Sequence, residues 1–170
     1  MGNCIRAWRS SSAGFAAIHG MLLTPNPTNV CFACGGANAR GMKLTFEQDD
    51  ANRRIRGSFR LGAEYQGGTD FIHGGIIALL LDEAMGKVNR FRQVRAVTAE
   101  LTIEYLKPVP VEKDLVVEAY EVEKNGRNLF HAGEIRDASG QVLARGRGRF
   151  VELNRAANPE GSAVQSPRAV

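Results

Sequence analysis

The chain has 170 residues, of which 44% are hydrophobic and 24% are charged, a balance typical of one soluble domain with a buried core. No apolar run approaches the ~20 residues that a membrane-spanning helix needs, so we expect no membrane span. The net charge is +4, but residues 31–154 carry 18 basic against 17 acidic side chains. With only 7% aromatic residues as well, this near-neutral body argues against a nucleic-acid partner.

The two ends of the chain differ from its body. Residues 1–30 resemble neither a myristoylation signal, because Arg6 stands where Ser or Thr is required, nor a secretion signal, because His19 interrupts the apolar part. We expect a disordered or misassigned leader over 1–30, with Met21 as an alternative start. Residues 155–170 are rich in Pro, Gly and Ser and predict a disordered tail. The folded domain is therefore expected over 31–154.

The chain has three cysteines, Cys4, Cys31 and Cys34, too few for a disulfide scaffold, which favours a reducing, cytoplasmic location. Cys31 and Cys34 have the Cys-x-x-Cys spacing of a zinc knuckle. Tetrahedral zinc needs four ligands, however, and neither a second Cys-x-x-Cys nor a His-x₃-His motif is present. We therefore expect no metal, and we interpret the pair as small packing residues ahead of a strand, with a metal site and a redox pair as the alternatives.

Apolar and polar residues alternate along most of the body, which is typical of half-buried strands. The first two such strands lie around 42–47 and 54–59, and a longer one covers 97–105, ended by Pro108 and Pro110. In that longer strand Thr98 falls on the polar face. Asn125-Gly126 predicts a type I′ hairpin turn between strands at 114–124 and 127–137, and Ala138-Ser139-Gly140 predicts a turn into 141–153.

Residues 73–90, which follow a glycine-rich loop over 62–72, give the one strong helix signal. Their apolar positions cover most of the helix circumference, as expected for an enclosed helix: Ile76, Ile77, Leu79, Leu80, Leu81, Ala84, Met85 and Val88. A doubly wound α/β sheet would need a helix after nearly every strand. The pattern therefore predicts an α+β domain, with an antiparallel sheet of about six strands wrapped around one long central helix.

An acid pair, Asp82-Glu83, lies within this apolar helix. Glu83 precedes Lys87 by four residues and predicts an ion pair at the solvent edge. Asp82 has the small residues Ala78 and Gly86 one turn away on either side, which leaves space above its carboxylate. A carboxylate on a buried helix is costly without a partner or a chemical role, so Asp82 is a catalytic candidate. The alternative is a carboxylate satisfied by strand hydroxyls or by backbone groups.

The helix begins with His73-Gly74-Gly75, where the glycines allow close approach and the unpaired N–H groups carry partial positive charge. This arrangement is typical of an oxyanion site. The alternative is a tight turn into the helix with His73 as a local cap.

The combined pattern resembles the hotdog-fold acyl-CoA thioesterases of the phenylacetic-acid-degradation type. The resemblance rests on His73-Gly74-Gly75, on Asp82 nine residues after the histidine, and on a strand that ends Glu104-Tyr105-Leu106-Lys107-Pro108. It extends to Cys31-Phe32-Ala33-Cys34-Gly35, Asn38, Gly41-Met42-Lys43-Leu44 and the Gln66-Gly67 segment, and covers residues 31–152. It implies the hotdog fold, hydrolysis of acyl-CoA without a cofactor, and homodimers that often pair into tetramers.

The resemblance also implies roles for individual residues. Asp82 takes the role of general base or nucleophile on the thioester, and the Gly74 N–H polarises the thioester carbonyl, with His73 in the same catalytic loop. Thr98 orients the attacking water, and Gln66 is the candidate for an assisting amide, although Tyr65 stands where many members carry His. Gly75 is expected to contact the substrate.

A basic stripe, Arg145, Arg147 and Arg149, projects from one face of the last strand because the strand period is two. Arg145 and Arg147 could meet the phosphates of coenzyme A. The alternative is a solvated strand face opposite acids such as Glu134. Two other functions stay open: a hydratase or dehydratase on the same fold with His73 as base, and a non-catalytic acyl-CoA-binding module.

Overall fold

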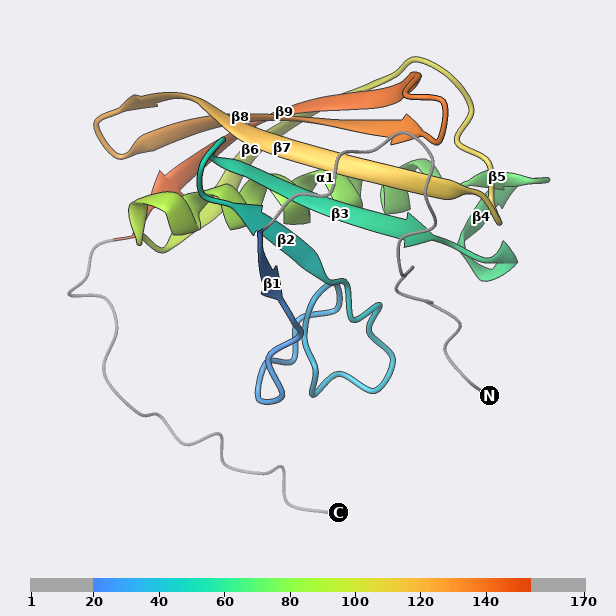
Figure 1. Cartoon of the computed structure of the whole chain (residues 1–170), viewed down its shortest axis with the longest axis horizontal. Helices are drawn as coiled ribbons and strands as arrows, with labels where there is room; N and C mark the ends of the chain where they lie inside the picture. The colour runs from blue at the N-terminus through green and yellow to red at the C-terminus, as the bar shows by residue number, and fades with distance from the viewer. Residues whose placement is uncertain (1–19, 154–170) are drawn as a thin grey trace.

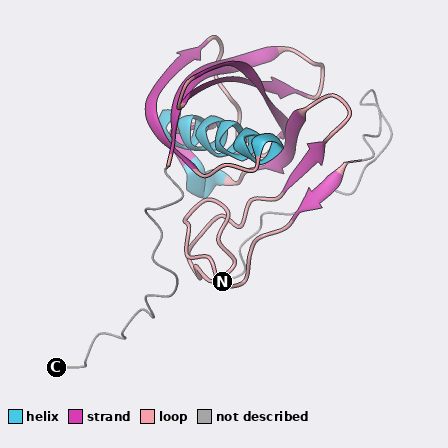
Figure 2. Cartoon of the chain, turned by 90° about the vertical axis from the view of Figure 1, so that its left-hand side faces the viewer, coloured by secondary structure: helices cyan, strands magenta, loops and turns pink. Residues whose placement is uncertain are grey.

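In the computed structural model, which describes residues 20–153, a curved antiparallel sheet wraps around one long helix (Figures 1 and 2). The strands of the main sheet follow the order β1-β2-β3-β7-β8-β9-β6. Their bounds are Met21–Leu23 (β1), Phe46–Asp49 (β2), Arg54–Arg60 (β3), Ala96–Tyr105 (β6), Asp114–Asn125 (β7), Asn128–Asp137 (β8) and Val142–Glu152 (β9). The helix α1 spans Gly74–Val88, and the short 3-10 helix η2 follows at Asn89–Arg92. The predicted α+β architecture is confirmed.

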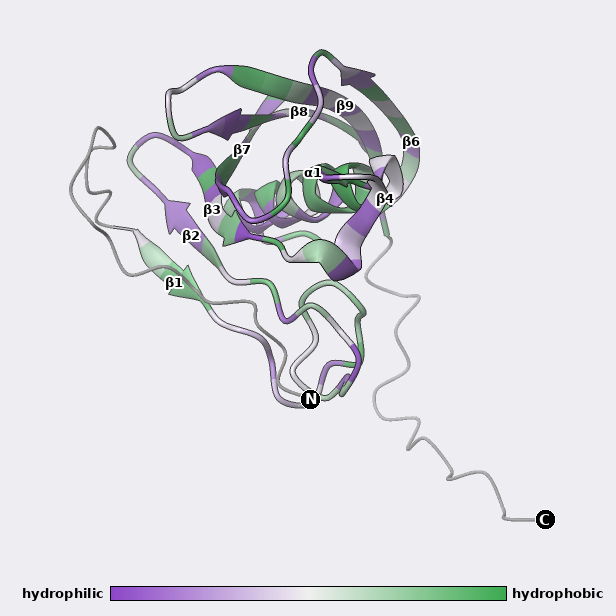
Figure 3. Ribbon diagram, turned by 90° about the vertical axis from the view of Figure 1, so that its right-hand side faces the viewer, coloured by the Kyte–Doolittle hydropathy of each residue, from purple (hydrophilic) through white to green (hydrophobic). Residues whose placement is uncertain are grey.

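The helix α1 is enclosed because strands β7 and β8 bury apolar side chains beside it, among them Leu115, Val117, Leu129 and Ile135. Figure 3 shows the largely hydrophobic helix within the curve of the sheet. Leu80, Leu81, Ala84, Met85 and Val88 are fully buried, which explains why apolar residues surround this helix instead of forming one stripe. The sheet can approach closely because β8 and β9 carry glycines on this face. A Cβ built on Gly133 or Gly146 would lie 3.4 or 3.3 Å from Met85 atoms.

Strand β1 lies inside the segment that we predicted as a leader, so for Met21–Leu23 that prediction is wrong. These residues pair with Phe46–Gln48 of β2 and extend the sheet by one strand. The sequence gives no periodic signal for a strand of three residues, which depends on its neighbour for every interstrand hydrogen bond. The predictions for residues 1–19 and 155–170 lie outside the described residues.

The strand expected around 42–47 begins later than the alternation indicates. Met42 and Leu44 are buried as predicted, but β2 starts only at Phe46. The N–H groups of Met42 and Leu44 donate to the carbonyls of Phe32 and Ala33, and Lys43 between them has a φ of 53°. The alternation therefore reports burial correctly, while the backbone of this segment pairs with a loop.

The expected glycine-rich loop over 62–72 contains local structure. A 3-10 turn, η1 (Ala63–Tyr65), leads into a two-stranded ribbon of β4 (Gln66–Gly68) and β5 (Phe71–Ile72). The backbone N–H of His73 donates to the Tyr65 carbonyl at 2.8 Å. This segment therefore fixes the position from which α1 begins.

The hairpin between β7 and β8 has a two-residue turn, as expected, but of another type. Asn125 pairs with Asn128, so the central residues are Gly126 and Arg127. Only Gly126 has a positive φ, at 56°. A type I′ turn needs two positive φ values, so one glycine at the first central position fits type II′ instead.

Within residues 20–153, no helix has the length and apolar character needed to cross a membrane.

Candidate active site

The half-buried carboxylate of Asp82 has one hydrogen-bond partner within the part of the chain that the structure describes. The Thr98 hydroxyl on β6 donates to Asp82 Oδ1 at 2.8 Å. Burial raises the pKa of Asp82 above its ordinary value and the Glu83 charge raises it further, while the hydrogen bond from Thr98 opposes both. A strand hydroxyl therefore does satisfy Asp82, as one of our two interpretations expected, and it leaves the other carboxylate oxygen available.

Thr98 reaches Asp82 because β6 contains a bulge. Thr98 pairs with Phe150 of β9 and Glu100 pairs with Arg149, which leaves Ala99 as an extra residue. A bulge changes which face the following residues present. Phe150 is buried on the inner face, so its partner Thr98 also faces inward, and our placement of Thr98 with the polar outer residues is wrong.

His73 caps the N-terminus of helix α1. Its Nδ1 accepts a hydrogen bond from the Gly75 N–H at 2.9 Å, so the capping interpretation is correct. This bond occupies the Gly75 amide and argues against a direct role for Gly75 in substrate binding. The imidazole itself is exposed and lies at the N-terminal end of α1, nine residues before Asp82 in the sequence.

Gly74 keeps a free amide. Among residues 20–153 its N–H has no hydrogen-bond partner, whereas its carbonyl accepts from the Tyr105 hydroxyl at 3.1 Å. The N–H is the first of the helix, where the aligned peptide dipoles concentrate positive charge. An oxyanion is the group that such an amide binds best.

Gln66 lies next to the start of the helix, because it pairs with Ile72 in the β4–β5 ribbon. Its side-chain oxygen accepts from the Asp70 N–H at 2.7 Å, so this oxygen holds the turn of the ribbon. The predicted assisting role stays a prediction, confined to the amide nitrogen. The adjacent Gly67 is required by close packing, since a Cβ there would lie 2.8 Å from the His73 Cα.

The two candidate groups on α1 are too far apart for one substrate carbon. Gly74 and Asp82 are eight residues apart, a rise of ~12 Å along the helix. Reacting groups need to approach within about 3–3.5 Å. One chain therefore presents two separate half-sites, one at the N-terminus of α1 and one near its middle.

In the structure, Glu83 lies beside the Cys31–Cys34 pair and forms a cluster of three groups with it. The two sulfurs and a carboxylate oxygen of Glu83 all lie within 4.8 Å of one another. Burial and the Glu83 carboxylate raise the pKa of Cys34 to about 12. A thiol with so high a pKa carries little thiolate, which argues against the redox interpretation. The sequence gives no signal for Glu83, which lies 49 residues after Cys34.

Several relatives share this arrangement of one helix and a wrapped sheet. A family model for the thioesterase superfamily matches residues 69–144, the range that contains Gly74, Asp82 and Thr98. A solved structure of a thioesterase superfamily protein superposes on this chain with a TM-score of 0.65 and 34% sequence identity. The superposition covers 69% of this chain and 57% of the other protein's chain. The chain is therefore similar to the thioesterase superfamily over 76 of its 170 residues. Its fold is the hotdog fold, as the sequence resemblance implied.

Among curated proteins, the chain is similar to acyl-coenzyme A thioesterase THEM4 of Rattus norvegicus. The two are 32% identical over 103 residues, which cover 61% of this chain and 44% of the relative. MIOREX complex component 3 of Saccharomyces cerevisiae is 30% identical over 89 residues, covering 51% of this chain and 33% of the relative. The chain thus spans about half the length, or less, of these relatives. The PaaI protein of the phenylacetic acid degradation operon of E. coli has the same fold, with a TM-score of 0.57 at 20% identity over 60% of this chain and 74% of PaaI.

The basic stripe lies on the outer face of β9, since Gly146 and Gly148 between the arginines face the inner side of the sheet. Arg145 forms an ion pair with Glu104 at 2.7 Å. Arg147 has no side-chain partner among residues 20–153. Within one chain these arginines do not join the site around Asp82, so their proposed contact with phosphates has no support from this geometry. The alternative of a solvated strand face opposite acids fits better. Glu134 lies directly opposite Arg145 where β8 pairs with β9, and its carboxylate also contacts Arg136.

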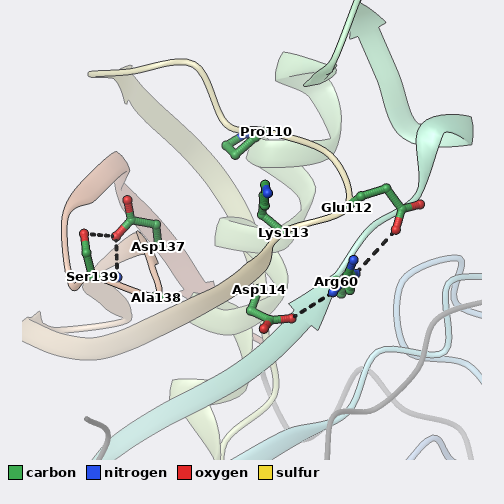
Figure 4. Close-up of a pocket in the computed structure, with 8 residues that line it drawn as sticks. All are labelled: Arg60, Pro110, Glu112, Lys113, Asp114, Asp137, Ala138 and Ser139. Atoms are coloured by element: carbon green, nitrogen blue, oxygen red, sulfur yellow. Dashed lines mark hydrogen bonds and ion pairs between the residues drawn. The ribbon is translucent and has the colours of Figure 1, made fainter. Parts of the chain in front are cut away.

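A cavity of about 430 Å³ lies away from these half-sites, between Arg60 of β3, the segment 110–114 and the turn 137–139 (Figure 4). Three of its charged groups are already paired, since Arg60 contacts Glu112 at 3.4 Å and Asp114 at 4.0 Å. Neither Asp82, Thr98 nor Gly74 lines it. We therefore do not assign the acyl substrate to this cavity.

Proposed function

We propose that this domain hydrolyses acyl-CoA thioesters to a free acid and coenzyme A. The observation that carries the proposal is the Asp82 carboxylate, oriented by the Thr98 hydroxyl at 2.8 Å on the inner side of the sheet. The match of residues 69–144 to the thioesterase superfamily supports thioester chemistry. The choice of acyl-CoA is supported by relatives named acyl-coenzyme A thioesterases, and by a Streptococcus mutans protein of this fold solved with acetyl CoA.

In the proposed reaction, Asp82 acts as a general base on water. Thr98 occupies one carboxylate oxygen, and the second oxygen accepts a proton as the water oxygen bonds to the thioester carbon. Collapse of the resulting tetrahedral intermediate breaks the bond between carbon and sulfur, and the coenzyme A thiolate leaves and takes up a proton. Direct attack by the carboxylate on the carbon is the alternative within the same site.

The negative charge that develops on the carbonyl oxygen needs a donor, and the Gly74 N–H is the proposed one. It is free among residues 20–153 and begins a helix of 15 residues. Such fixed donors stabilise an oxyanion without reorganisation. His73 contributes indirectly, because its bond to the Gly75 N–H fixes the first turn of the helix.

Because Asp82 and Gly74 are ~12 Å apart along one helix, we propose that a second copy of the chain completes each site. Strand β6 forms one edge of the main sheet, and within the described residues it pairs only with β9. It is ten residues long and exposes Val97 and Tyr105, so it is an open edge for pairing. A two-fold dimer along β6 would bring Asp82 of each chain toward Gly74 of the other.

A panel of acyl-CoA thioesters tests the proposal, with release of free coenzyme A measured by a thiol reagent. Asp82→Asn keeps the shape of the side chain and removes the base, so turnover should fall ~10²–10⁴-fold. Asp114→Asn, at the cavity of Figure 4, is the matched control and should keep full turnover. No hydrolysis of any thioester in the panel, or full activity of Asp82→Asn, would contradict the proposal.

A further inference from the structure

The cluster of Cys31, Cys34 and Glu83 lies where the loop between β1 and β2 meets α1. Glu83 directly follows Asp82 in α1, but its carboxylate contacts Lys87 at 2.9 Å, as the sequence predicted, and lies beside the two sulfurs. The side chains of Glu83 and Lys87 are each only 17% exposed, so this ion pair is more buried than the solvent-edge pair that we expected. The loop itself is visible below the helix in Figure 1.

The backbone of the loop holds the two cysteines in a fixed geometry. The Cys31 N–H donates to Asn29 Oδ1 at 2.8 Å, and the Gly35 N–H donates to the Cys31 carbonyl at 3.0 Å. A Cβ on Gly35 would lie 2.4 Å from the backbone carbonyl oxygen of Asn29 and 2.5 Å from the backbone nitrogen of Cys31. Only glycine fits after the second cysteine, so the loop is built to keep the two thiols on one side.

The chemistry of these three groups fits a borderline-soft divalent cation. Two thiolates and one carboxylate are ligands that zinc accepts, and mutual distances within 4.8 Å allow one ion to contact all three after small rotamer changes. The ligands would carry a charge of −3, and Lys87 beside them carries +1. A divalent cation therefore makes the half-buried cluster neutral.

We propose that Cys31, Cys34 and Glu83 bind one zinc ion, with water in the fourth position. The ion would link the loop to α1 at the turn that carries Asp82, and so would act on stability instead of on the thioester. This inference is independent of the proposed hydrolysis. It revises our expectation of no metal, which depended on a search for local ligand spacing and could not include a ligand 49 residues away.

The full chain, treated with a chelator and kept in a non-thiol reductant, tests the site by titration with Co²⁺ and then Zn²⁺. We expect a thiolate-to-cobalt charge-transfer band and the visible bands of tetrahedral cobalt, saturating at one ion per chain and displaced by Zn²⁺. Zinc should also raise the melting temperature, because it binds only the folded arrangement. Absence of these bands, or saturation without thiolate bands, would overturn the proposal.

Variants separate this site from other thiols and carboxylates. Cys31→Ser and Cys34→Ser should each remove the charge-transfer band of bound cobalt or weaken it strongly. Glu83→Gln should raise the dissociation constant for Zn²⁺ about tenfold or more, since even partners outside the ligand set cost that much. Asp82→Asn, the neighbouring carboxylate on the same helix, is the matched control and should bind zinc as wild type does. Equal affinity of Glu83→Gln and Asp82→Asn would exclude Glu83 as a ligand.

Circular dichroism of each metal-free variant checks that a lost band does not come from a lost fold. Cys4→Ser provides a second control, since Cys4 is not one of the three proposed ligands. If Cys4→Ser loses the cobalt band while Cys34→Ser keeps it, the ion binds elsewhere and the assignment is wrong.

Discussion

The Thr98 hydroxyl lies 2.8 Å from the Asp82 carboxylate because strand β6 contains one residue more than its partner β9 at this point. The extra residue, Ala99, turns Thr98 from the outer face of the sheet toward the helix. Bulges next to functional sites commonly re-aim a side chain in this way. The bulge is therefore part of the proposed catalytic arrangement.

Replacement of Thr98 tests this arrangement directly. Thr98→Val keeps the shape but removes the donor, and a hydrogen bond to a charged group is worth ~1.5–3 kcal/mol, so turnover should fall about tenfold or more. Thr98→Ser keeps the hydroxyl and should retain most of the activity. Measurement of kcat for both variants on the best thioester shows whether the hydrogen bond contributes to turnover. A Thr98→Val enzyme within twofold of wild type would mean that the bond has no catalytic role.

Mixed dimers test whether Gly74 and Asp82 meet across an interface. Gly74→Pro removes the proposed oxyanion donor at the first helical position, where proline is tolerated, and His73 before it already has the extended ψ of 136° that proline requires. Asp82→Ala removes the base. Each homodimer should be nearly inactive, whereas co-refolded chains should recover about a quarter of wild-type activity, since half of the dimers are mixed and each has one intact site.

The control for this experiment is each variant co-refolded with itself, which should stay inactive. Native mass spectrometry establishes the fraction of mixed dimers. Mixed dimers that form without any recovery of activity would show that the two residues do not share a site.

Acid should destabilise the fold through His131. This residue is 1% exposed, donates its Nδ1–H to the Met85 carbonyl at 2.9 Å and stacks on Phe150. Burial lowers the pKa of His131 below its ordinary value of 6.5, with Arg92 acting in the same direction and Glu121 and the Met85 carbonyl opposing. Because the folded state takes up a proton less readily than the unfolded state, stability falls as pH drops below ~6.5.

Urea unfolding at pH 7.5 and pH 5.5 measures this effect. A single group sets a limit of about 1.4 kcal/mol per pH unit on the slope. His131→Gln removes the titrating group and should flatten the dependence, although its stability at pH 7.5 should be lower. The same slope in wild type and variant would assign the effect to other residues.

Two glycines should respond differently to the same substitution. Gly35→Ala places a Cβ 2.4 Å from a backbone oxygen and should cost ~1–3 kcal/mol of folding free energy by overpacking. Gly68→Ala meets nothing within 4 Å and should change stability by less than ~0.5 kcal/mol. Thermal unfolding measures the stability of each variant relative to wild type. Equal stability would mean that the loop around Cys31 can shift at little cost.

The sequence determined the features that depend on local periodicity. The enclosed helix and most strands of the sheet follow from side-chain spacing, because burial on one face repeats every 2 or 3.6 residues. The same spacing places Asp82 within an apolar helix, whereas the roles expected of Gly74 and Asp82 are implied by the family resemblance. The separation of Gly74 and Asp82 along the helix follows from the same spacing. The glycine of the β7–β8 turn was also evident, although the turn type depended on which residues paired.

Only the tertiary structure decided which faces meet. The inward direction of Thr98 depends on the register between β6 and β9, and the outward direction of Arg145 depends on which side of the sheet packs on α1. Strand β1 exists only because β2 offers an edge, and Glu83 reaches Cys31 and Cys34 only through packing of a loop on the helix. Pairing and packing join residues far apart in the chain, so no local pattern contains them.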